Sequence, residues 1–188
     1  MAYYVSYAAG EVNFEALPVA KITEYPLEKA DYKPFAQCIL CAVPDGIWLR
    51  MWAFEVFSSP ESELRAVLKI LGDTAAALHV RVRADSPVRA DAWVELSDGQ
   101  NMAVSVSSSP FNGEDLQGVY WGASVFMSYD DIRQSADLTP LVPGATFPGN
   151  FYKMRTDEPY VHMGSYIHAN FSGGRPFDSL GVFEVVSW

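Results

Sequence analysis

The strongest constraint on how this chain folds is an alternation of apolar and polar residues that recurs along it. In the segment 46–55 one parity is apolar and the other mixes aromatic and basic residues. The first parity holds Ile47, Leu49, Met51 and Ala53, and the second holds Trp48, Arg50, Trp52 and Phe54. A period of two is that of a β-strand, whose successive side chains point to opposite faces. The segments 79–84, 92–96, 102–107, 119–127 and 181–186 repeat the pattern.

Turn sequences separate these segments, at 44–46, 97–99 and 108–113. The run 94–106, broken at 97–100, predicts a hairpin. Short strands joined in this way are typical of an antiparallel β-sandwich or barrel. No internal repeat, low-complexity tract or linker interrupts the sequence. We therefore expect one domain over residues 1–188, with the all-β fold of an antiparallel β-sandwich and one or two short helices.

One helix is expected to begin after Ser58 or Ser59, either of which can cap it, and to end at Gly72. Pro60 suits its first turn, and four apolar residues follow helical spacing on one face: Leu64, Val67, Leu68 and Leu71. A second, shorter helix is expected within 129–136.

Composition and charge narrow the classes of partner. Hydrophobic residues make up 49% of the chain and charged residues 19%, which excludes intrinsic disorder. The formal net charge of −10 repels phosphate backbones and anionic membrane surfaces, so neither nucleic acid nor membrane is an expected partner. No export signal or run of about 20 apolar residues is seen. The chain as given is expected to be cytoplasmic, or extracellular if a leader has been removed.

Motifs for catalysis and metal binding are weak. Cys38 and Cys41 fall on opposite parities of a predicted strand, which indicates core thiols rather than a redox or zinc pair. His162 and His168 would need a third ligand such as Asp157 or Glu158 to hold a metal, and Ser165 lacks a nucleophile elbow. We expect no catalytic residue, metal or cofactor.

A sugar platform is suggested by the segment 91–96. Asp91, Trp93 and Glu95 share one strand parity, opposite the apolar Ala92 and Val94. An indole can stack on the apolar face of a pyranose while carboxylates accept hydrogen bonds from its hydroxyls. At spacing four the two carboxylates lie about 13 Å apart, beyond the roughly 6.5–9.5 Å of an inverting glycosidase. The alternative is that Trp93 packs under a neighbouring loop.

Trp48 and Trp52 share a strand face with Arg50, and we expect both indoles in the core. If they were exposed instead, they would form an apolar patch suited to self-association. A homo-oligomer is therefore an open alternative.

The C-terminal third carries a resemblance to a known family. It contains Gly-Asn-Phe-Tyr-Lys at 149–153, Glu-Pro-Tyr-Val-His-Met-Gly-Ser-Tyr at 158–166 and Arg-Pro-Phe-Asp-Ser-Leu-Gly-Val-Phe at 175–183. This series resembles the end of the family-9 carbohydrate-binding modules, particularly their stand-alone, family-9-like bacterial relatives. The upstream segment 86–96 resembles a strand of the same family, and the order agrees over roughly the whole chain. The resemblance implies a DOMON-like β-sandwich, a fold that hosts sugar in some members and haem in others.

The resemblance places Glu95 where the family has an acidic sugar ligand. It also shows departures. The family clamps the sugar between two tryptophans, and this chain has Val88 at one position and Gly173-Gly174-Arg175 at the other. An arginine that the family can use is absent from 102–107. The family can carry structural calcium, but no compact calcium loop is visible here.

Together these observations predict a non-catalytic domain that binds a mono- or oligosaccharide. Trp93 is expected to stack on the sugar, with Tyr166 or Phe177 closing over it and Glu95, Lys153 and Arg175 forming hydrogen bonds. Asp91 and His162 complete the expected ligand-binding set. Three alternatives stay open: a structural or protein-interaction domain with a decayed sugar site, a hydrolase using His162 and a carboxylate, and a haem pocket with His162 as an axial ligand.

Overall fold

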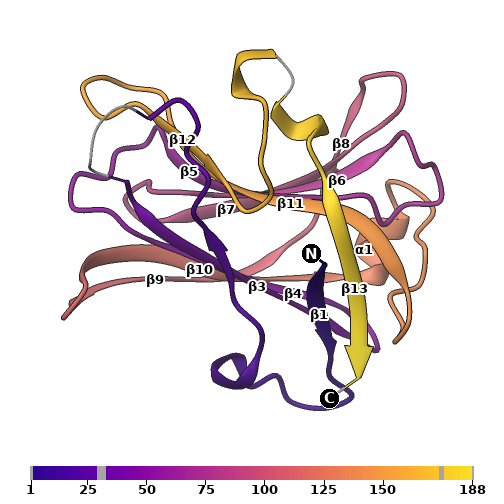
Figure 1. The fold of residues 1–188 in the computed structure, drawn as a ribbon. Coiled ribbons are helices and arrows are strands. Elements are labelled where there is room, and N and C mark those ends of the chain that lie inside the picture. The colour runs from indigo at the N-terminus through magenta and orange to yellow at the C-terminus, as the bar shows by residue number, and fades with distance from the viewer. Residues whose placement is uncertain (1, 29–32, 174–175, 188) are drawn as a thin grey trace.

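Figure 1 shows the computed structural model of the chain, which describes residues 2–28, 33–173 and 176–187. Within these residues thirteen strands form one curled sheet in the order β8-β7-β6-β5-β11-β13-β1-β3-β4-β10-β9, with β12 beside β11 and β2 beside β3. The strands are β1 Tyr3–Tyr7, β2 Ala20–Ile22, β3 Phe35–Val43, β4 Gly46–Phe54, β5 Ser62–Leu68, β6 Ala77–Arg83, β7 Arg89–Glu95, β8 Asn101–Val104, β9 Ser107–Asp115, β10 Gly118–Ser128, β11 Thr146–Arg155, β12 His162–Ser165 and β13 Gly181–Ser187.

The sheet folds back on itself into two layers (Figure 1). Strands β5, β6, β7, β8 and β11 form the first layer, and β3, β4, β9 and β10 form the second, while β13 and β1 run along one side and join them. The β1 strand pairs in parallel with both β13 and β3. The other pairings among the described strands are antiparallel, so the predicted all-β sandwich is confirmed, with a mixed rather than fully antiparallel sheet.

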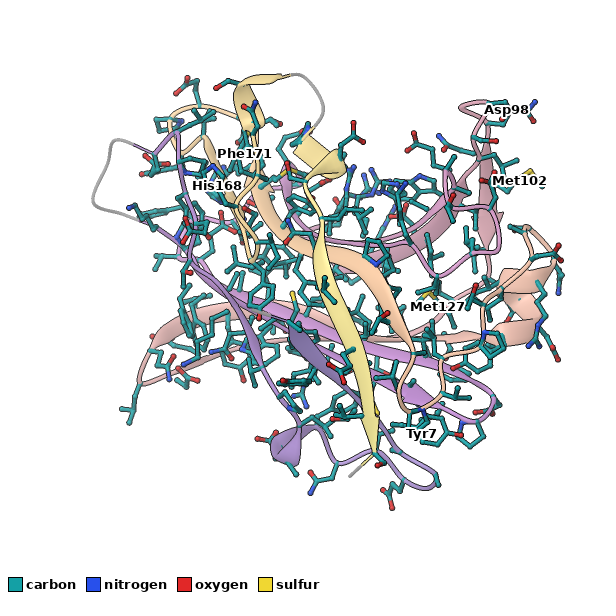
Figure 2. All side chains as sticks on the ribbon, turned by 45° about the vertical axis from the view of Figure 1, so that its right-hand side comes forward. Tyr7, Asp98, Met102, Met127, His168 and Phe171 are labelled. Atoms are coloured by element: carbon teal, nitrogen blue, oxygen red, sulfur yellow. The ribbon has the colours of Figure 1, made fainter. Side chains whose placement is uncertain are left out.

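The interior between the layers is filled by the apolar parity of each strand. In β4, Ile47, Leu49, Met51 and Ala53 are fully buried, as expected. Met127 of β10 lies between the layers in Figure 2 and is also fully buried. The prediction that Trp48 and Trp52 lie in the core is wrong. Both are half-buried on the outer face of the second layer, because the opposite parity of β4 already fills the interior.

The prediction of a helix that ends at Gly72 is also wrong, since residues 62–68 of this segment form strand β5. Leu64, Ala66 and Leu68 alternate into the core, while Glu63 and Arg65 point outward. The leucines at 64 and 68 fit helical spacing and strand parity equally well over so short a run. Pairing with both β6 and β11 satisfies the backbone of β5 and decides for the strand.

The shorter helix is confirmed as α1, Tyr129–Arg133, which Ser128 caps through the backbone N–H of Asp131. Three 3-10 turns complete the fold: η1 Phe14–Ala16, η2 Phe171–Gly173 and η3 Pro176–Asp178. The turns predicted at 44–46 and 97–99 join β3 to β4 and β7 to β8. The segment 108–113, predicted as a turn, lies in β9. Pro110 is tolerated there because β9 is an edge strand.

Cys38 and Cys41 are buried free thiols on opposite faces of β3, as predicted. Among the described residues, no helix has the length and apolar character needed to cross a membrane.

Candidate functional site

A cleft of about 620 Å³ opens on the outer face of the first layer. The ends of β6 and β7 form its floor, the β7–β8 turn forms one wall, and η3 forms the other. Figure 2 labels Asp98 at the tip of that hairpin, which rises from the layer. The principal side chains of the cleft are Lys69, His79, Glu95, Asp98, Phe177 and Asp178.

Strand register builds the floor. The pairing of β6 with β7 sets His79 opposite Trp93 and Ala77 opposite Glu95. Ala92 and Val94 are buried in the core, so Asp91, Trp93 and Glu95 share the outer face, as the alternation predicts. Of these three, only Glu95 lines the cleft, with a side chain that is 54% exposed.

His79 is the buried centre of the floor and was missed by the sequence analysis. Its ring stacks on the indole of Trp93, with centroids 5.1 Å apart and planes 9° apart. Its Nε2 lies 3.3 Å from Oε2 of Glu95. Burial, and then the charge of Arg65, lower the pKa of His79 to about 4. The imidazole is therefore neutral at pH 7 and holds the Glu95 carboxylate at the edge of the cleft.

Phe177 is positioned by the C-terminal arch, described over residues 166–173 and 176–180, which covers part of the outer face of the first layer. Its ring packs edge-to-face on Tyr152 (5.1 Å) and His79 (6.0 Å) and contacts the guanidinium of Arg65 (4.3 Å). Phe177 thereby supplies one aromatic wall of the cleft.

The motif at 150–153 explains how the arch is held. The Asn150 amide donates to the carbonyls of Ile167 and Ser179 and accepts from the N–H of Ile167. The Tyr152 hydroxyl lies 3.1 Å from the carbonyl of Pro176 and 3.0 Å from that of Ser179, so it can donate to either. Two side chains of β11 therefore fix the segment that presents Phe177.

Trp93 and Asp91 lie beside the cleft on the same outer face. One neighbour of the Trp93 ring is His79, and the guanidinium carbons of Arg81 and Arg65 lie 5.2 and 5.3 Å from its centroid. Asp91 accepts two hydrogen bonds from Arg81, at 3.1 and 2.8 Å. Neither residue belongs to the lining of the cleft, and Trp93, half-buried beside it, packs against His79.

Lys153 and His162 do not reach the cleft. They lie in a cluster enclosed by the two layers, 0% and 3% exposed, on the other side of β11 from Tyr152. The Lys153 ammonium donates to Oε2 of Glu55 (3.1 Å) and to Nε2 of His162 (2.8 Å). Trp121 and Ser62 also donate to the Glu55 carboxylate. The prediction that Lys153 and His162 contact the ligand is therefore wrong, because the donors of this cluster point into the interior.

The hydrogen bonds of His162 fix its protonation. Its Nε2 accepts from Lys153, so Nδ1 carries the proton and donates to the carbonyl of Tyr160 at 2.8 Å. Burial, with the charge of Lys153, lowers the pKa of His162 to about 4. Both ring nitrogens are thus engaged, which leaves none for a haem iron or for Ser165, whose buried Oγ makes no hydrogen bond within the described chain.

The other expected contacts fall elsewhere. Tyr166 packs in the aromatic core, with its ring 5.7 Å from that of Tyr3. Asp157 is held by Arg155 through two hydrogen bonds. Arg175 lies outside the described residues. In the parts of the chain that the structure describes, no group of three His, Cys, Asp or Glu side chains is arranged to hold a metal ion.

Solved structures with the same fold are known, although the sequence comparisons found no match. No family model and no curated protein matches the chain. A candidate carbohydrate-binding protein from Bacteroides uniformis ATCC 8492 superposes with a TM-score of 0.71 at 14% identity, over 98% of both chains.

A family-9 carbohydrate-binding module (CBM9) from Caldicellulosiruptor kristjanssonii, solved with glucose, gives a TM-score of 0.62 at 12% identity, over 100% of this chain and 97% of the module. The module with cellotriose gives the same TM-score and identity, over 100% and 95% of the two chains. The resemblance to the family-9 modules is therefore confirmed at the level of fold.

Proposed function

We propose that this chain is a non-catalytic carbohydrate-binding domain whose sugar site is the cleft between the β7–β8 turn and η3. The observation that carries the proposal is the convergence of Glu95 and Phe177 on one cleft, across a floor formed by His79. The volume of about 620 Å³ lies within the roughly 300–1,000 Å³ of small-molecule sites. The similar modules that were solved with glucose and cellotriose support a sugar as the ligand.

Each residue has a distinct role in this proposal. Phe177 packs its ring against the C–H face of a pyranose, in place of the family's tryptophans. Glu95 accepts hydrogen bonds from vicinal hydroxyls, which are stronger because the acceptor is charged. Trp93 and Asp91 act indirectly: Trp93 supports His79, and Asp91 holds Arg81 in place.

The charge around the cleft favours a neutral sugar. Glu95, Asp98 and Asp178 bring three carboxylates, whereas Lys69 is the one cationic side chain at pH 7 among the cleft's described lining, since His79 is neutral. Its ammonium donates to the carbonyl of Thr74 at 2.8 Å, which draws it toward its own loop. A uronic acid would meet net repulsion here, and the affinity for neutral sugars is expected to be modest because polar groups must be desolvated.

Isothermal titration against glucose, galactose, xylose and cellotriose tests the proposal. At least one sugar should bind, and Glu95→Gln and Phe177→Ala should each weaken it by about tenfold, the equivalent of one charged hydrogen bond or one stacking contact. Matched controls are Glu114→Gln and Phe57→Ala, whose side chains are exposed away from the cleft. Loss of affinity in the controls but not in the cleft variants, or no heat with any sugar from a folded sample, would overturn it.

A further inference from the structure

We propose a second carbohydrate site, in a groove on the outer face of the second layer. The groove has a volume of about 500 Å³. Arg50, Trp52 and Phe54 of β4 form its floor, η1 and Val19 form one wall, and the β9–β10 hairpin forms the other. This face is the outer side of the layer opposite to the cleft (Figure 1). The inference does not depend on the cleft.

Aromatic rings line the groove on three sides. Trp52, Phe111 and Tyr120 are all half-buried, so each keeps part of its surface open. The rings also support one another: Tyr120 lies 5.6 Å from Phe54 and 6.5 Å from Phe111. A rigid set of partly open rings provides stacking surface at little entropic cost.

Arg50 is held at the centre of this set mainly by the rings, with one long ion pair beside them. Its guanidinium carbon lies 5.0 Å from the ring centre of Phe111, 5.5 Å from Phe14 and 5.9 Å from Trp52. Within the described chain its acidic partner is Glu15, at 3.8 Å, which is beyond hydrogen-bonding distance. The guanidinium therefore keeps its donors for a ligand while its position is fixed by cation–π contacts.

The polar lining identifies the class of ligand. Gln37 and Gln117 add amide groups, and Glu15 and Asp115 add carboxylates at the rim. An apolar peptide would leave these groups unpaired, and a polyanion would meet both the rim carboxylates and a net charge of −10. Rings beside amide, carboxylate and guanidinium groups match a neutral sugar, which offers an apolar ring face and hydroxyls that both donate and accept.

Two sites on opposite layers would make the domain bivalent toward a polysaccharide. Engagement of one chain segment by each site would raise the apparent affinity for long or clustered glycans without any new contact.

The test is a titration of the cleft-disabled variant Glu95→Gln/Phe177→Ala with glucose and cellotriose, followed by NMR of the tryptophan indole N–H groups. Assignment comes from Trp52→Phe and Trp93→Phe. The signal of Trp52 should shift in a saturable way, whereas that of Trp93, on the other layer, should not. Adding Arg50→Gln, an exposed-side substitution that leaves the core intact, should weaken the response by about tenfold.

The outcomes separate the two proposals. An unmoved Trp52 signal with both sugars, or a shift that Arg50→Gln leaves unchanged, overturns the second site. If the wild type instead binds one equivalent of sugar that Arg50→Gln removes and the cleft variants do not, the second site stands and the cleft proposal fails.

Discussion

The imidazole of His79 lies parallel to the indole of Trp93, 5.1 Å away at an angle of 9°, and the same imidazole approaches the carboxylate of Glu95 at 3.3 Å. Trp93 thus lies beside the lining of the cleft rather than in it. The platform expected from the sequence is displaced by one strand: the tryptophan of β7 supports a histidine of β6, and that histidine forms the floor.

Replacing Trp93 by alanine should therefore weaken sugar binding without removing any residue that lines the cleft. We expect a several-fold loss of affinity, because His79 loses the surface on which it stacks. The free energy of unfolding should fall by about 2 kcal/mol, roughly half the cost of truncating a fully buried tryptophan. Trp93→Phe should recover most of both quantities, as measured by titration calorimetry and urea denaturation. Equal affinity in Trp93→Ala and wild type would contradict the supporting role.

Replacing Tyr152 by phenylalanine tests how the C-terminal arch is held. The substitution removes the hydroxyl that donates to the arch carbonyls but keeps the ring beneath Phe177. Stability should fall by about 1 kcal/mol, the net value of one hydrogen bond. Sugar affinity should fall several-fold because the wall of the cleft loosens. Tyr4→Phe, at a side chain exposed to solvent, is the matched control and should change neither quantity.

Stability should depend on pH through two buried histidines. Burial lowers the pKa of both His79 and His162 to about 4, from an ordinary value of 6.5. Between these values the unfolded chain binds protons that the folded chain does not, so the free energy of unfolding should fall as the pH drops from about 6.5 to about 4. Above pH 6.5 the two imidazoles are neutral in both the folded and the unfolded chain, so their contribution to the free energy of unfolding is constant. His162→Gln should flatten the slope, and His168→Gln, at a largely exposed side chain, is the control.

The enclosed Glu55–Lys153 pair should behave as one unit. Lys153→Met alone should cost about 3–5 kcal/mol, because the buried Glu55 carboxylate loses its nearer counter-charge and keeps only Arg155, at 3.9 Å. Adding Glu55→Gln should recover part of that loss, giving a coupling energy of the opposite sign to the single effects. Sugar affinity of the double variant should stay within about twofold of wild type, since neither side chain reaches the cleft. Denaturant titrations of the full cycle measure the coupling, and strictly additive effects would argue against it.

Charge should set selectivity at the cleft. Glucuronate should bind more weakly than glucose, by roughly three- to tenfold, given that exposed charge contacts are each worth about 0.2–1 kcal/mol. The difference in affinity between glucose and glucuronate should decrease as salt is raised, because exposed charges are screened. Asp98→Asn should decrease the same difference at low salt. Tighter binding of glucuronate than of glucose would contradict the neutral-sugar assignment.

Much of the fold is predictable from strand parity, and the exceptions have physical causes. The residues of β4 and β7 alternate cleanly because each strand has one core face. Segment 62–68 misleads because Val67 is also buried, beneath the C-terminal arch, which blurs the period of two. Trp48 and Trp52 mislead because the outer face of the second layer is itself aromatic.

The site is less predictable because its parts meet through tertiary contacts. Glu95 and Phe177 could be named from the strand parity and the family resemblance, yet their shared cleft depends on an arch far along the chain. His79 belongs to a segment that alternation predicts as a strand. Its stacking partner Trp93 depends on the register between β6 and β7, which alternation does not give. Lys153 looks like a ligand contact until Glu55, 98 residues earlier, is found beside it in the interior.

An NMR titration of backbone amides with cellotriose tests the central claim most directly. We predict saturable shifts concentrated at residues 77–79, 95–99 and 177–178, three of the segments that border the cleft. Amides in these segments that stay unmoved at saturating sugar, while other regions respond or none does, would contradict the assignment of this cleft as the sugar site.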